Sequence, residues 1–399
     1  MTLAELLSLE EAQSRILARV VRLPLEQVDL GEAAGRFSAE PATARIDLPP
    51  FDASAMDGFA VRTEDTPGRL PVGERIAAGR PATRALRAGE AMGIATGAAV
   101  PEGADAVIPL EYVVDRDNTA EIGERVEAGA NIRPRGGDLR AGTVVVSAGA
   151  RLGPAQLGAL AAAGVADIST TARPRAAVLS TGSELRRPGE TLAPGQIYEV
   201  NGVLLAAQLA SAGAMVEQLD AVADDKDAHQ SALERGLEAD ILVTSGGVSV
   251  GPHDLVRSVG AQLGVEEVLW GVAVKPGKPL WFGVRGETLV FGLPGNPVSA
   301  LVCFELFVRP ALLSLQGAAE PLPRFEPGRL ARSVRPNAVR TELVRARSRV
   351  VDGEVELEAL EGQDSHMIAR AAGADALVLV PAGEAELAAG SRVSFLRLA

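Results

Sequence analysis

The sequence contains very little cysteine and histidine, and these shortages exclude several kinds of site. Its one cysteine, Cys303, lies in the apolar run VSALVCFELF, so no disulfide can form within a single chain, which fits a reducing compartment. The three histidines, His229, His253 and His366, are far apart in the sequence. Because protein zinc sites are built mainly from Cys and His, we expect none, whereas an oxygen-bound cation such as Mg²⁺ remains open.

Long apolar runs and a positive charge balance are also missing. The sequence has no run of 18 consecutive apolar residues, so a membrane-spanning helix is not expected. The N-terminal segment MTLAELLSLEEAQSRIL lacks the basic start of a signal peptide. The net charge of −13 disfavours nonspecific binding to nucleic acid, which depends on Lys and Arg. With 47% hydrophobic and 23% charged residues, the chain is expected to be fully folded and cytoplasmic, with no nucleic-acid or membrane partner.

Lysine is scarce, and its placement is therefore informative. Of the 39 basic residues only three are lysines, and two of these, Lys275 and Lys278, lie together in the motif VKPGKP. An ammonium group and a guanidinium group are not interchangeable, so the pair indicates a loop that holds a doubly charged oxyanion or a pyrophosphate. A solvated basic turn is the alternative. The motif is not a P-loop, because the upstream Gly spacing and the Lys-Ser/Thr ending are absent.

Hydrophobic patterns predict four domains of different character. Helical spacing at 4–22 and 153–165 indicates a helical linker, and the short alternating strands between these segments indicate an inserted β-rich domain. Buried strands that alternate with helices from about residue 173 predict a three-layer α/β domain with a mostly parallel sheet, and a small C-terminal β-domain follows. The expected domains span residues 1–45 with 138–172, 46–137, 173–318 and 322–399.

Three loops that follow predicted strands of the α/β domain have unusual compositions. Ligands of open α/β sheets bind outside the carboxyl ends of the strands, so these loops are the first place to look for a site. The glycines of Ser245–Gly251 let backbone N–H groups approach an anion, although a tight turn would explain them equally well. In Pro294–Pro297, Asn296 is placed to cap a helix whose N-terminus faces the crevice. The third loop is Thr181–Leu185.

The N-terminal half carries three more motifs that are dense in turns. Residues 49–60 (PPFDASAMDGFA) combine apolar residues with two carboxylates, and residues 96–107 and 131–138 are rich in Gly, Pro and charged residues. A structural hairpin is the alternative for the first motif, and a surface ion pair is the alternative for the last.

Taken in order, these motifs resemble the signature set of the MoeA and gephyrin E-domain family. The matching segments are PPFDASAMDGFA, TGAAVPEGADAV, NIRPRGGD, VLSTGSEL, SGGVSVGPHD, VKPGKP and GLPGNPVS. The resemblance extends over about residues 4–370. Seven matches in the same order are far more specific than any single motif. The resemblance implies a four-part, L-shaped homodimer with a MogA-like central domain, a β-barrel-like C-terminal domain and a cleft shared between subunits.

What the resemblance implies for function is a molybdopterin molybdenumtransferase. Such an enzyme inserts molybdate into molybdopterin-AMP with Mg²⁺ and releases AMP, in the last step of molybdenum cofactor synthesis. Expected partners are a molybdopterin adenylyltransferase and other proteins that make or accept the cofactor. The catalytic residues carried over are Asp57, Thr96, Glu184, Asp254, Lys275 and Lys278. Those expected to bind substrate are Ser245, Gly246, Gly247, Ser249, Pro294, Gly295, Asn296, Pro297, Ser299, Arg340 and Ser365. The expected metal ligands are Glu184, Asp225 and Asp254.

The sequence departs from the family pattern at three places. Phe59 stands where Tyr is usual, Gly137 where Glu is usual and Ser183 where Asp is usual. The last change removes a carboxylate from position 183, whereas Glu184 and the lysines persist. Because molybdate and pyrophosphate are both anionic, we expect fixed positive potential to dominate catalysis.

Two other functions are compatible with parts of the sequence. A MogA-type adenylyltransferase shares the central fold and the style of its loops, but the single copy of that domain and the N-terminal motifs favour the insertion step. A cofactor-binding or scaffolding module is the alternative that is not an enzyme. Such a protein would bind molybdopterin without releasing AMP when molybdate is added.

Overall fold

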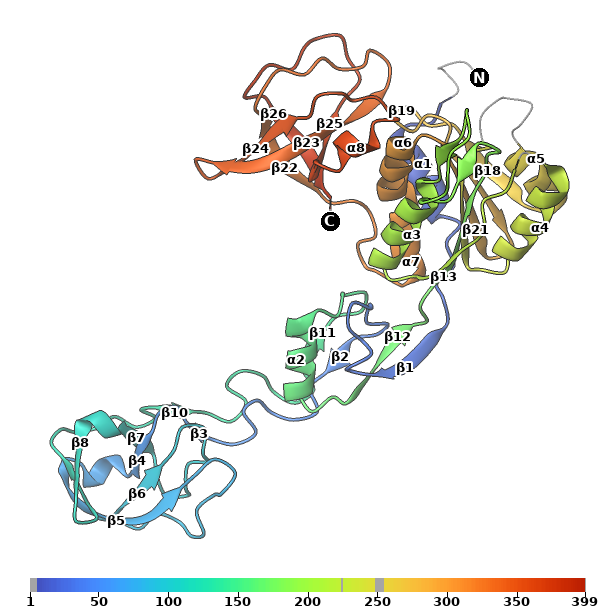
Figure 1. Ribbon diagram of the computed structural model, residues 1–399. Coiled ribbons are helices and arrows are strands. Elements are labelled where there is room, and N and C mark those ends of the chain that lie inside the picture. Colours follow the sequence, from blue (N-terminus) through green and yellow to red (C-terminus); the bar gives the residue numbers. More distant parts are fainter. Residues whose placement is uncertain (1–5, 224, 248–254, 399) are drawn as a thin grey trace.

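The protein is built from a central α/β domain, a C-terminal barrel and two smaller N-terminal units, as Figure 1 shows. The computed structural model describes residues 6–223, 225–247 and 255–398. The linker unit and the β-rich unit extend away from the central domain in an elongated arm, while the barrel lies beside that domain (Figure 1). The expected multidomain α/β fold with a C-terminal β-barrel is therefore confirmed.

The central sheet has six strands and is mostly parallel, as expected. Its spatial order is β16 (Met215–Gln218), β13 (Arg175–Ser180), β17 (Ile241–Ser245), β21 (Thr288–Leu293), β20 (Trp281–Arg285) and β18 (Glu266–Trp270). Only β20 runs antiparallel to its neighbours. The short connection from β20 to β21 explains this direction, because a tight turn can join antiparallel strands but not parallel ones.

Helices cover both faces of this sheet and make it a three-layer domain. Side chains alternate along β13, so that Ala176 and Val178 join one core cluster while Ala177 and Leu179 join the other. One face is covered by α1 (Leu9–Leu17), α3 (Asn201–Ser211), α6 (Pro297–Cys303) and α7 (Arg309–Leu315). The other face is covered by α4 (Lys226–Gly236) and α5 (Leu255–Gln262).

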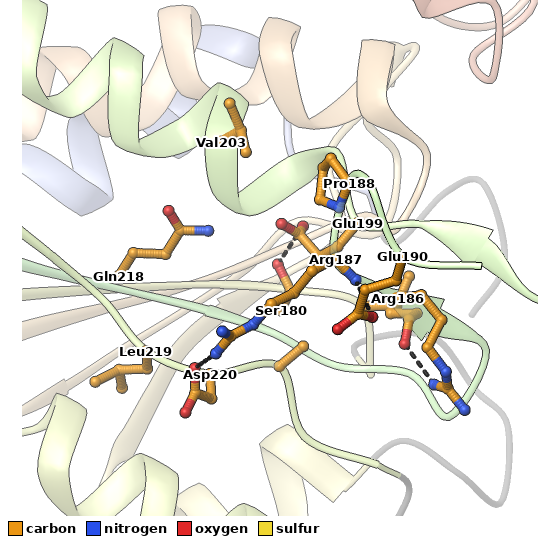
Figure 2. A pocket seen from close by; sticks show the side chains of 12 residues that line it. Ser180, Arg186, Arg187, Pro188, Glu190, Glu199, Val203, Gln218, Leu219 and Asp220 are labelled. Atoms are coloured by element: carbon orange, nitrogen blue, oxygen red, sulfur yellow. Dashed lines mark hydrogen bonds and ion pairs between the residues drawn. The ribbon is translucent and has the colours of Figure 1, made fainter. Parts of the chain in front are cut away.

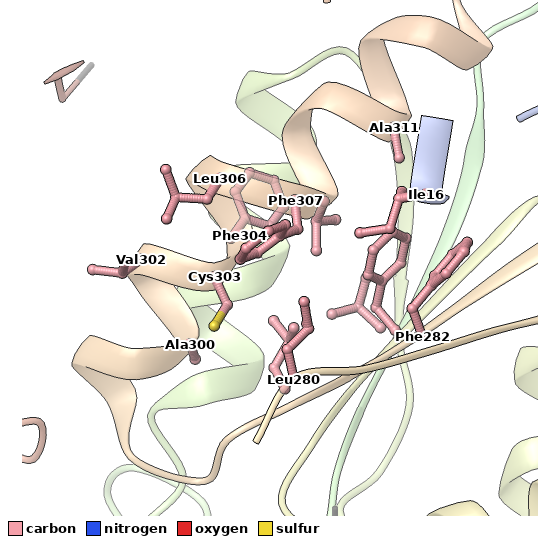
Figure 3. Close-up of a cluster of buried hydrophobic side chains, with 14 of the residues drawn as sticks. Ile16, Leu280, Phe282, Ala300, Val302, Cys303, Phe304, Leu306, Phe307 and Ala311 are labelled. Carbon is pink, nitrogen blue, oxygen red and sulfur yellow. The ribbon is translucent and has the colours of Figure 1, made fainter. Parts of the chain in front are cut away.

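Helix α1 corrects the expected assignment of residues 1–45 to the linker. Its apolar side chains, including Ala12 and Ile16, are buried in the core of the central domain (Figure 3). The helix is also shorter than the range 4–22, because Ser8 caps it: the Glu11 N–H donates to Ser8 Oγ at 3.1 Å, and the Ser8 N–H donates to the Glu11 carboxylate at 2.9 Å. These hydrogen bonds lower the pKa of Glu11.

The linker unit consists of two strand pairs and one helix around a small core. Its strands are β1 (Leu25–Asp29), which pairs with β12 (Asp167–Thr171), and β2 (Ala42–Thr43), which pairs with β11 (Val144–Val146). Helix α2 (Pro154–Ala162) begins with a proline at its first position, where the missing N–H costs no hydrogen bond. The expected helix at 153–165 is thus confirmed, although strands contribute as much to this unit.

The β-rich unit is a six-stranded sheet with one additional strand pair. The sheet has the order β7 (Ala106–Pro109), β4 (Gly58–Val61), β6 (Ala91–Ile94), β5 (Gly68–Ile76), β9 (Thr119–Ile122) and β8 (Val113–Arg116). The pair is β3 (Ala53–Ser54) with β10 (Ile132–Arg133). Two single-turn helices lie at Thr63–Asp65 and Leu110–Tyr112.

The C-terminal domain is a closed five-stranded barrel joined to the central domain by one more strand. Strand β23 (Thr341–Val351) pairs with both β24 (Glu354–Ala359) and β25 (Ala376–Val380), and β22 (Phe325–Leu330) with β26 (Arg392–Arg397) completes the ring. Strand β19 (Val274–Lys275), from the central domain, pairs with the start of β23. A short helix, α8 (Ile368–Ala371), follows the loop after β24.

The apolar segment that closes the central domain is a buried core helix. Among the described helices, Pro297–Leu315 is long and apolar enough to cross a membrane, with a mean hydropathy of 1.8, but 78% of its most apolar stretch is buried inside the protein. It contains a π-helical segment, Phe304–Val308, between α6 and α7. Phe304 and Phe307 from this segment pack beside Cys303 in the core (Figure 3).

Cys303 provides a direct test of this core. Its side chain has no exposed surface, its Sγ lies 3.6 Å from the carbonyl oxygen of Gly277, and burial raises the pKa of the thiol far above its ordinary value. Since the thiolate is the reactive form, we expect Ellman's reagent not to label the folded protein and to label one thiol per chain after unfolding in guanidinium. Labelling of the folded protein at the rate of free cysteine would contradict this packing.

Candidate active site

A cavity of about 620 Å³ lies at the carboxyl edge of the central sheet, where the three unusual loops meet. The loops after β13, β17 and β21 form its walls, and the segment before α3 and part of the C-terminal domain complete it. Seven of the predicted site residues line the cavity: Glu184, Ser245, Gly246, Gly247, Gly295, Asn296 and Pro297. The prediction that ligands bind outside the carboxyl ends of the strands thus leads to a real cavity.

The glycines of the loop after β17 are required by its geometry. Gly246 has φ +90° and Gly247 has φ +65°, a region that side chains with Cβ rarely adopt. A methyl group at Gly246 would lie 2.7 Å from the carbonyl oxygen of Thr181 in the neighbouring loop. The loop therefore packs closely against the loop after β13, and the Gly246 N–H is used within the protein, since it donates to the Leu293 carbonyl oxygen at 3.1 Å.

Asn201, the first residue of α3, ties the loops together. Its Nδ2 donates to Ser245 Oγ and to the Gly295 carbonyl oxygen, both at 2.7 Å. Ser245 Oγ in turn lies 3.4 Å from the Pro294 carbonyl oxygen, so the hydroxyl of this predicted substrate ligand takes part in the support of the loops. Asn201 was not among the residues predicted from sequence. Its position at the start of an apolar helix was the only available signal.

The turn before α6 connects the cavity to the C-terminal domain. Asn296 occupies the cap position of α6 as predicted, although its side chain makes no capping hydrogen bond. Its Nδ2 donates instead to Ser365 Oγ at 2.8 Å, and the Val298 N–H donates to the Ser365 carbonyl oxygen at 3.0 Å. Two predicted residues from different domains are thereby brought into contact.

A buried arginine holds the loop that carries Ser365. Arg345 is 2% exposed, and its guanidinium donates to the carbonyl oxygens of Gly362, Asp364 and Met367 at 2.9 to 3.3 Å. Burial lowers the pKa of this guanidinium. The same loop contributes His366, which lines the cavity. Neither Arg345 nor His366 was predicted, because nothing in the sequence distinguishes this arginine from the other arginines of the barrel.

The two lysines predicted to hold an oxyanion are not among the residues that line the glycine-walled cavity. Lys275 Nζ forms an ion pair with Glu342 Oε1 at 2.9 Å, and the Glu342 side chain is 9% exposed. Lys275 is the register partner of Glu342 in the β19–β23 pair, and Arg340 lies two residues before Glu342. The carboxylate of Glu342 therefore attracts Lys275 toward the barrel.

The lysine loop contacts α6, the helix that begins at the cavity. Between its two lysines, Gly277 is packed against α6, where its carbonyl oxygen contacts Cys303. Ser299, another predicted residue, is buried on the same helix. We call Lys275, Lys278 and Arg340 the cationic junction. It lies between the central domain and the barrel, and α6 leads from it to the cavity.

The predicted acidic ligands are only partly brought together. Glu184 lines the cavity and is exposed, whereas Asp225 caps α4 by accepting the Ala228 N–H at 2.9 Å. Asp254 and Ser249 lie outside the described residues. Within the described ranges, no three His, Cys, Asp or Glu side chains form a group that could hold a metal ion. Asp225 therefore has a structural role that does not require a metal.

Asp57 and Thr96 lie in the β-rich unit, at the far end of the elongated arm in Figure 1. They contact each other, since the Thr96 N–H donates to Asp57 Oδ1 at 2.7 Å. Both side chains belong to exposed residues. Within one chain, the fold brings these two residues together but keeps them away from the cavity.

Comparisons with known proteins agree with this architecture along the chain. The sequence profile of the MoeA N-terminal region (domains I and II) matches residues 7–164, and that of the MoeA C-terminal region (domain IV) matches residues 327–398. Between them, residues 177–314 match a profile described as a probable molybdopterin binding domain. The fold and the cavity thus define a multidomain protein built around a domain of this type.

Individual relatives extend over nearly the whole chain. The molybdopterin molybdenumtransferase 2 of Mycobacterium tuberculosis is 38% identical over 97% of this chain and 98% of its own. The molybdopterin molybdenumtransferase of Haemophilus influenzae is 39% identical over 78% of each chain. A crystal structure of the Pyrococcus horikoshii molybdopterin biosynthesis MoeA protein superimposes with a TM-score of 0.81 at 33% identity, covering 98% of this chain and 99% of that one. The chain belongs to the MoeA family.

The close contact at Gly246 predicts that a side chain at this position destabilises the folded protein. We expect Gly246→Ala to lower the free energy of unfolding by about 2 to 4 kcal/mol, because the methyl group meets a backbone oxygen and the positive φ is strained. Gly286→Ala is the matched control, since Gly286 also has a positive φ of +59° but nothing within 4 Å of its Cβ position. Equal losses in urea unfolding would show that the contact with Thr181 is unimportant.

The Lys275–Glu342 pair predicts energetic coupling between the central domain and the barrel. We expect a double-mutant cycle of Lys275→Gln and Glu342→Gln to give a coupling energy of about 1 kcal/mol, because each single change leaves a partner unpaired. The exposed pair Arg332–Glu358, at 3.1 Å, is the control and should give a coupling near zero. Urea denaturation measures both cycles, and equal coupling in the two pairs would contradict a special role for the interdomain pair.

Proposed function

We propose that this chain is a molybdopterin molybdenumtransferase, which inserts molybdate into molybdopterin-AMP and releases AMP. The observation that carries the proposal is the arrangement of two subsites along α6: a glycine-walled cavity at the start of the helix and the cationic junction beside its end. Relatives that carry this name cover nearly the whole length of the chain. A substrate with both a pyrophosphate and a metal-accepting dithiolene needs two such subsites.

The chain's own residues have distinct tasks in this scheme. The backbone N–H of Gly247 is the candidate donor to the phosphates, because Gly247 has no side chain to block the approach and the Gly246 N–H donates to the Leu293 carbonyl oxygen at 3.1 Å. Lys275, Lys278 and Arg340 attract molybdate at the junction. The candidate hydroxyl donors are Ser299, which is buried on α6, and Ser365, which is bonded to Asn296 at the start of that helix. Positive charge that is fixed before the reaction stabilises a dianionic substrate without a further cost of reorganisation.

Magnesium fits this site as an ion that shares the substrate's phosphates. Mg²⁺ is usually held by one or two carboxylates together with phosphate oxygens and water. Glu184 is an exposed carboxylate that lines the cavity. Such an ion would neutralise charge on the pyrophosphate. Glu184 is the residue that we assign to hold it, with Asp254 as the second candidate from the sequence.

A homodimer would supply the residues that one chain keeps apart. Asp57 and Thr96 lie in the β-rich unit, remote from their own cavity, so they would serve the cavity of a second subunit. We further propose that the protein works in the cytoplasm and receives its substrate from a molybdopterin adenylyltransferase, because molybdopterin-AMP is the product of that class of reaction.

The test of this function is AMP release from purified molybdopterin-AMP with and without molybdate. We expect release to depend on molybdate and to fall about 100-fold in Lys278→Gln and in Lys275→Gln, because each variant loses positive charge at the junction. Lys226→Gln is the matched control, since Lys226 is the third lysine and lies exposed on α4. Turnover like that of the unaltered protein in both junction variants would refute the role assigned to these lysines.

A further inference from the structure

Glu199 lies where the glycine-walled cavity meets a second cavity of about 640 Å³. The residue precedes α3, is 7% exposed and contributes to the lining of both spaces. Figure 2 shows the second cavity, with the Glu199 carboxylate between Ser180 and the chain around Pro188. The position is central to the site, yet neither the motifs nor the proposed reaction uses this residue.

The carboxylate of Glu199 has no cationic partner among the described residues. Its Oε1 accepts hydrogen bonds from Ser180 Oγ at 2.8 Å and from the Gly202 N–H at 2.6 Å. The nearest arginines in the cavity wall are used elsewhere: Arg187 pairs with Asp220, and Arg186 donates to the Leu185 carbonyl oxygen at 2.6 Å (Figure 2).

Burial of a carboxylate is costly unless hydrogen bonds or a cation compensate for the lost water. A carboxylate has about four acceptor positions, and the protein donors named above use one oxygen only. A methyl group at Gly202 would lie 2.7 Å from Glu199 Oε2, so the absence of a side chain at Gly202 leaves room for this second oxygen. Glu199 therefore retains acceptor capacity at a place that a ligand can enter.

Asn201 adds a second acceptor two residues later. Its Nδ2 is occupied by Ser245 and Gly295, which fixes the orientation of the amide. Its Oδ1 is buried and has no hydrogen-bond donor within the described part of the chain. Two neighbouring groups that accept and do not donate indicate a ligand that carries several N–H donors.

The rim of the cavity favours a flat ring over a sugar. Ile197, Tyr198 and Val200 line the cavity and are 54%, 43% and 37% exposed, so apolar surface stands at its entrance. Apolar and aromatic side chains at a rim suit the face of a planar heterocycle. The acceptors at Glu199 and Asn201 would then meet the edge of that ring.

We propose that Glu199 binds the pterin ring of molybdopterin through the ring's 2-amino group and N3–H, and that Asn201 Oδ1 is the second acceptor. The inference rests on the proposed function, which supplies the substrate. The pterin edge presents two adjacent N–H donors, and Glu199 Oε2 keeps the two acceptor positions that such a pair requires. Adenine has no such pair, because its amino group adjoins ring nitrogens that accept. Glu199 is on this assignment a specificity-determining residue of the site.

The experiment compares the binding of molybdopterin, molybdopterin-AMP and AMP to the full-length protein by anaerobic titration calorimetry. We expect Glu199→Gln to weaken the first two ligands about 10- to 100-fold, because an amide cannot accept with both positions, and to leave AMP within about twofold. Glu199→Asp, which keeps the carboxylate, should bind molybdopterin more tightly than Glu199→Gln. Asp220→Asn is the control, since it removes one charge from the exposed wall of the second cavity.

The outcomes separate this inference from the proposed function. If AMP binding alone weakens in Glu199→Gln, the carboxylate binds the ribose hydroxyls and the pterin assignment is overturned. Unchanged binding of all three ligands overturns it as well. Should Glu199→Gln fail to fold, as judged by thermal unfolding, Glu199→Asp must weaken molybdopterin and spare AMP. Molybdate-dependent AMP release by the unaltered protein tests the function independently of all these variants.

Discussion

The junction between β19 and β23 is the constraint on which the proposed site depends. Two residues of the central domain pair in parallel register with the first residues of β23 in the barrel, and the buried Glu342 carboxylate forms an ion pair with Lys275 across this junction. Asn296 and Ser365 form a second connection at the start of α6. Because both connections join the same two domains, the barrel cannot move without displacing the cationic junction and one wall of the cavity.

The interior of the site consists largely of polar groups that position one another. Asn201 bonds to Ser245 and Gly295, while Arg345 fixes the loop of Ser365 through backbone carbonyl oxygens. Buried polar networks of this kind stabilise a protein only when their members are satisfied. Oδ1 of Asn201 is buried and is the exception within this described network, and Asn201 is a residue that lines the cavity. An unsatisfied acceptor on a residue that lines the cavity points to a ligand, whereas the satisfied members of the network point only to structural roles.

Local sequence patterns were sufficient for the architecture but not for the side-chain partners. Strand β17 (Ile241–Ser245) belongs to the alternation of buried strands and helices that was predicted from about residue 173, because a short apolar run after a helix has few alternatives in an α/β fold. Asn296 was correctly placed at a helix start, yet its amide bonds to a residue 69 positions away. The same holds for Lys275, whose partner comes from another domain. Glu199 was missed altogether, since burial of a carboxylate cannot be read from one sequence.

An acidic chain that handles anions must separate its charges, and the structure indicates how. Lys275 and Arg340 lie at the junction, whereas the carboxylate of Glu199 and the amide of Asn201 lie in the cavity at the start of α3. A uniformly positive cavity would attract any phosphate, because Coulomb attraction does not distinguish one anion from another. On the proposed function, the site has positive charge at the junction and hydrogen-bond acceptors in the cavity. Only a molecule with an anionic group at one place and N–H donors at another matches both. Discrimination then follows from the distribution of charge and not from its total.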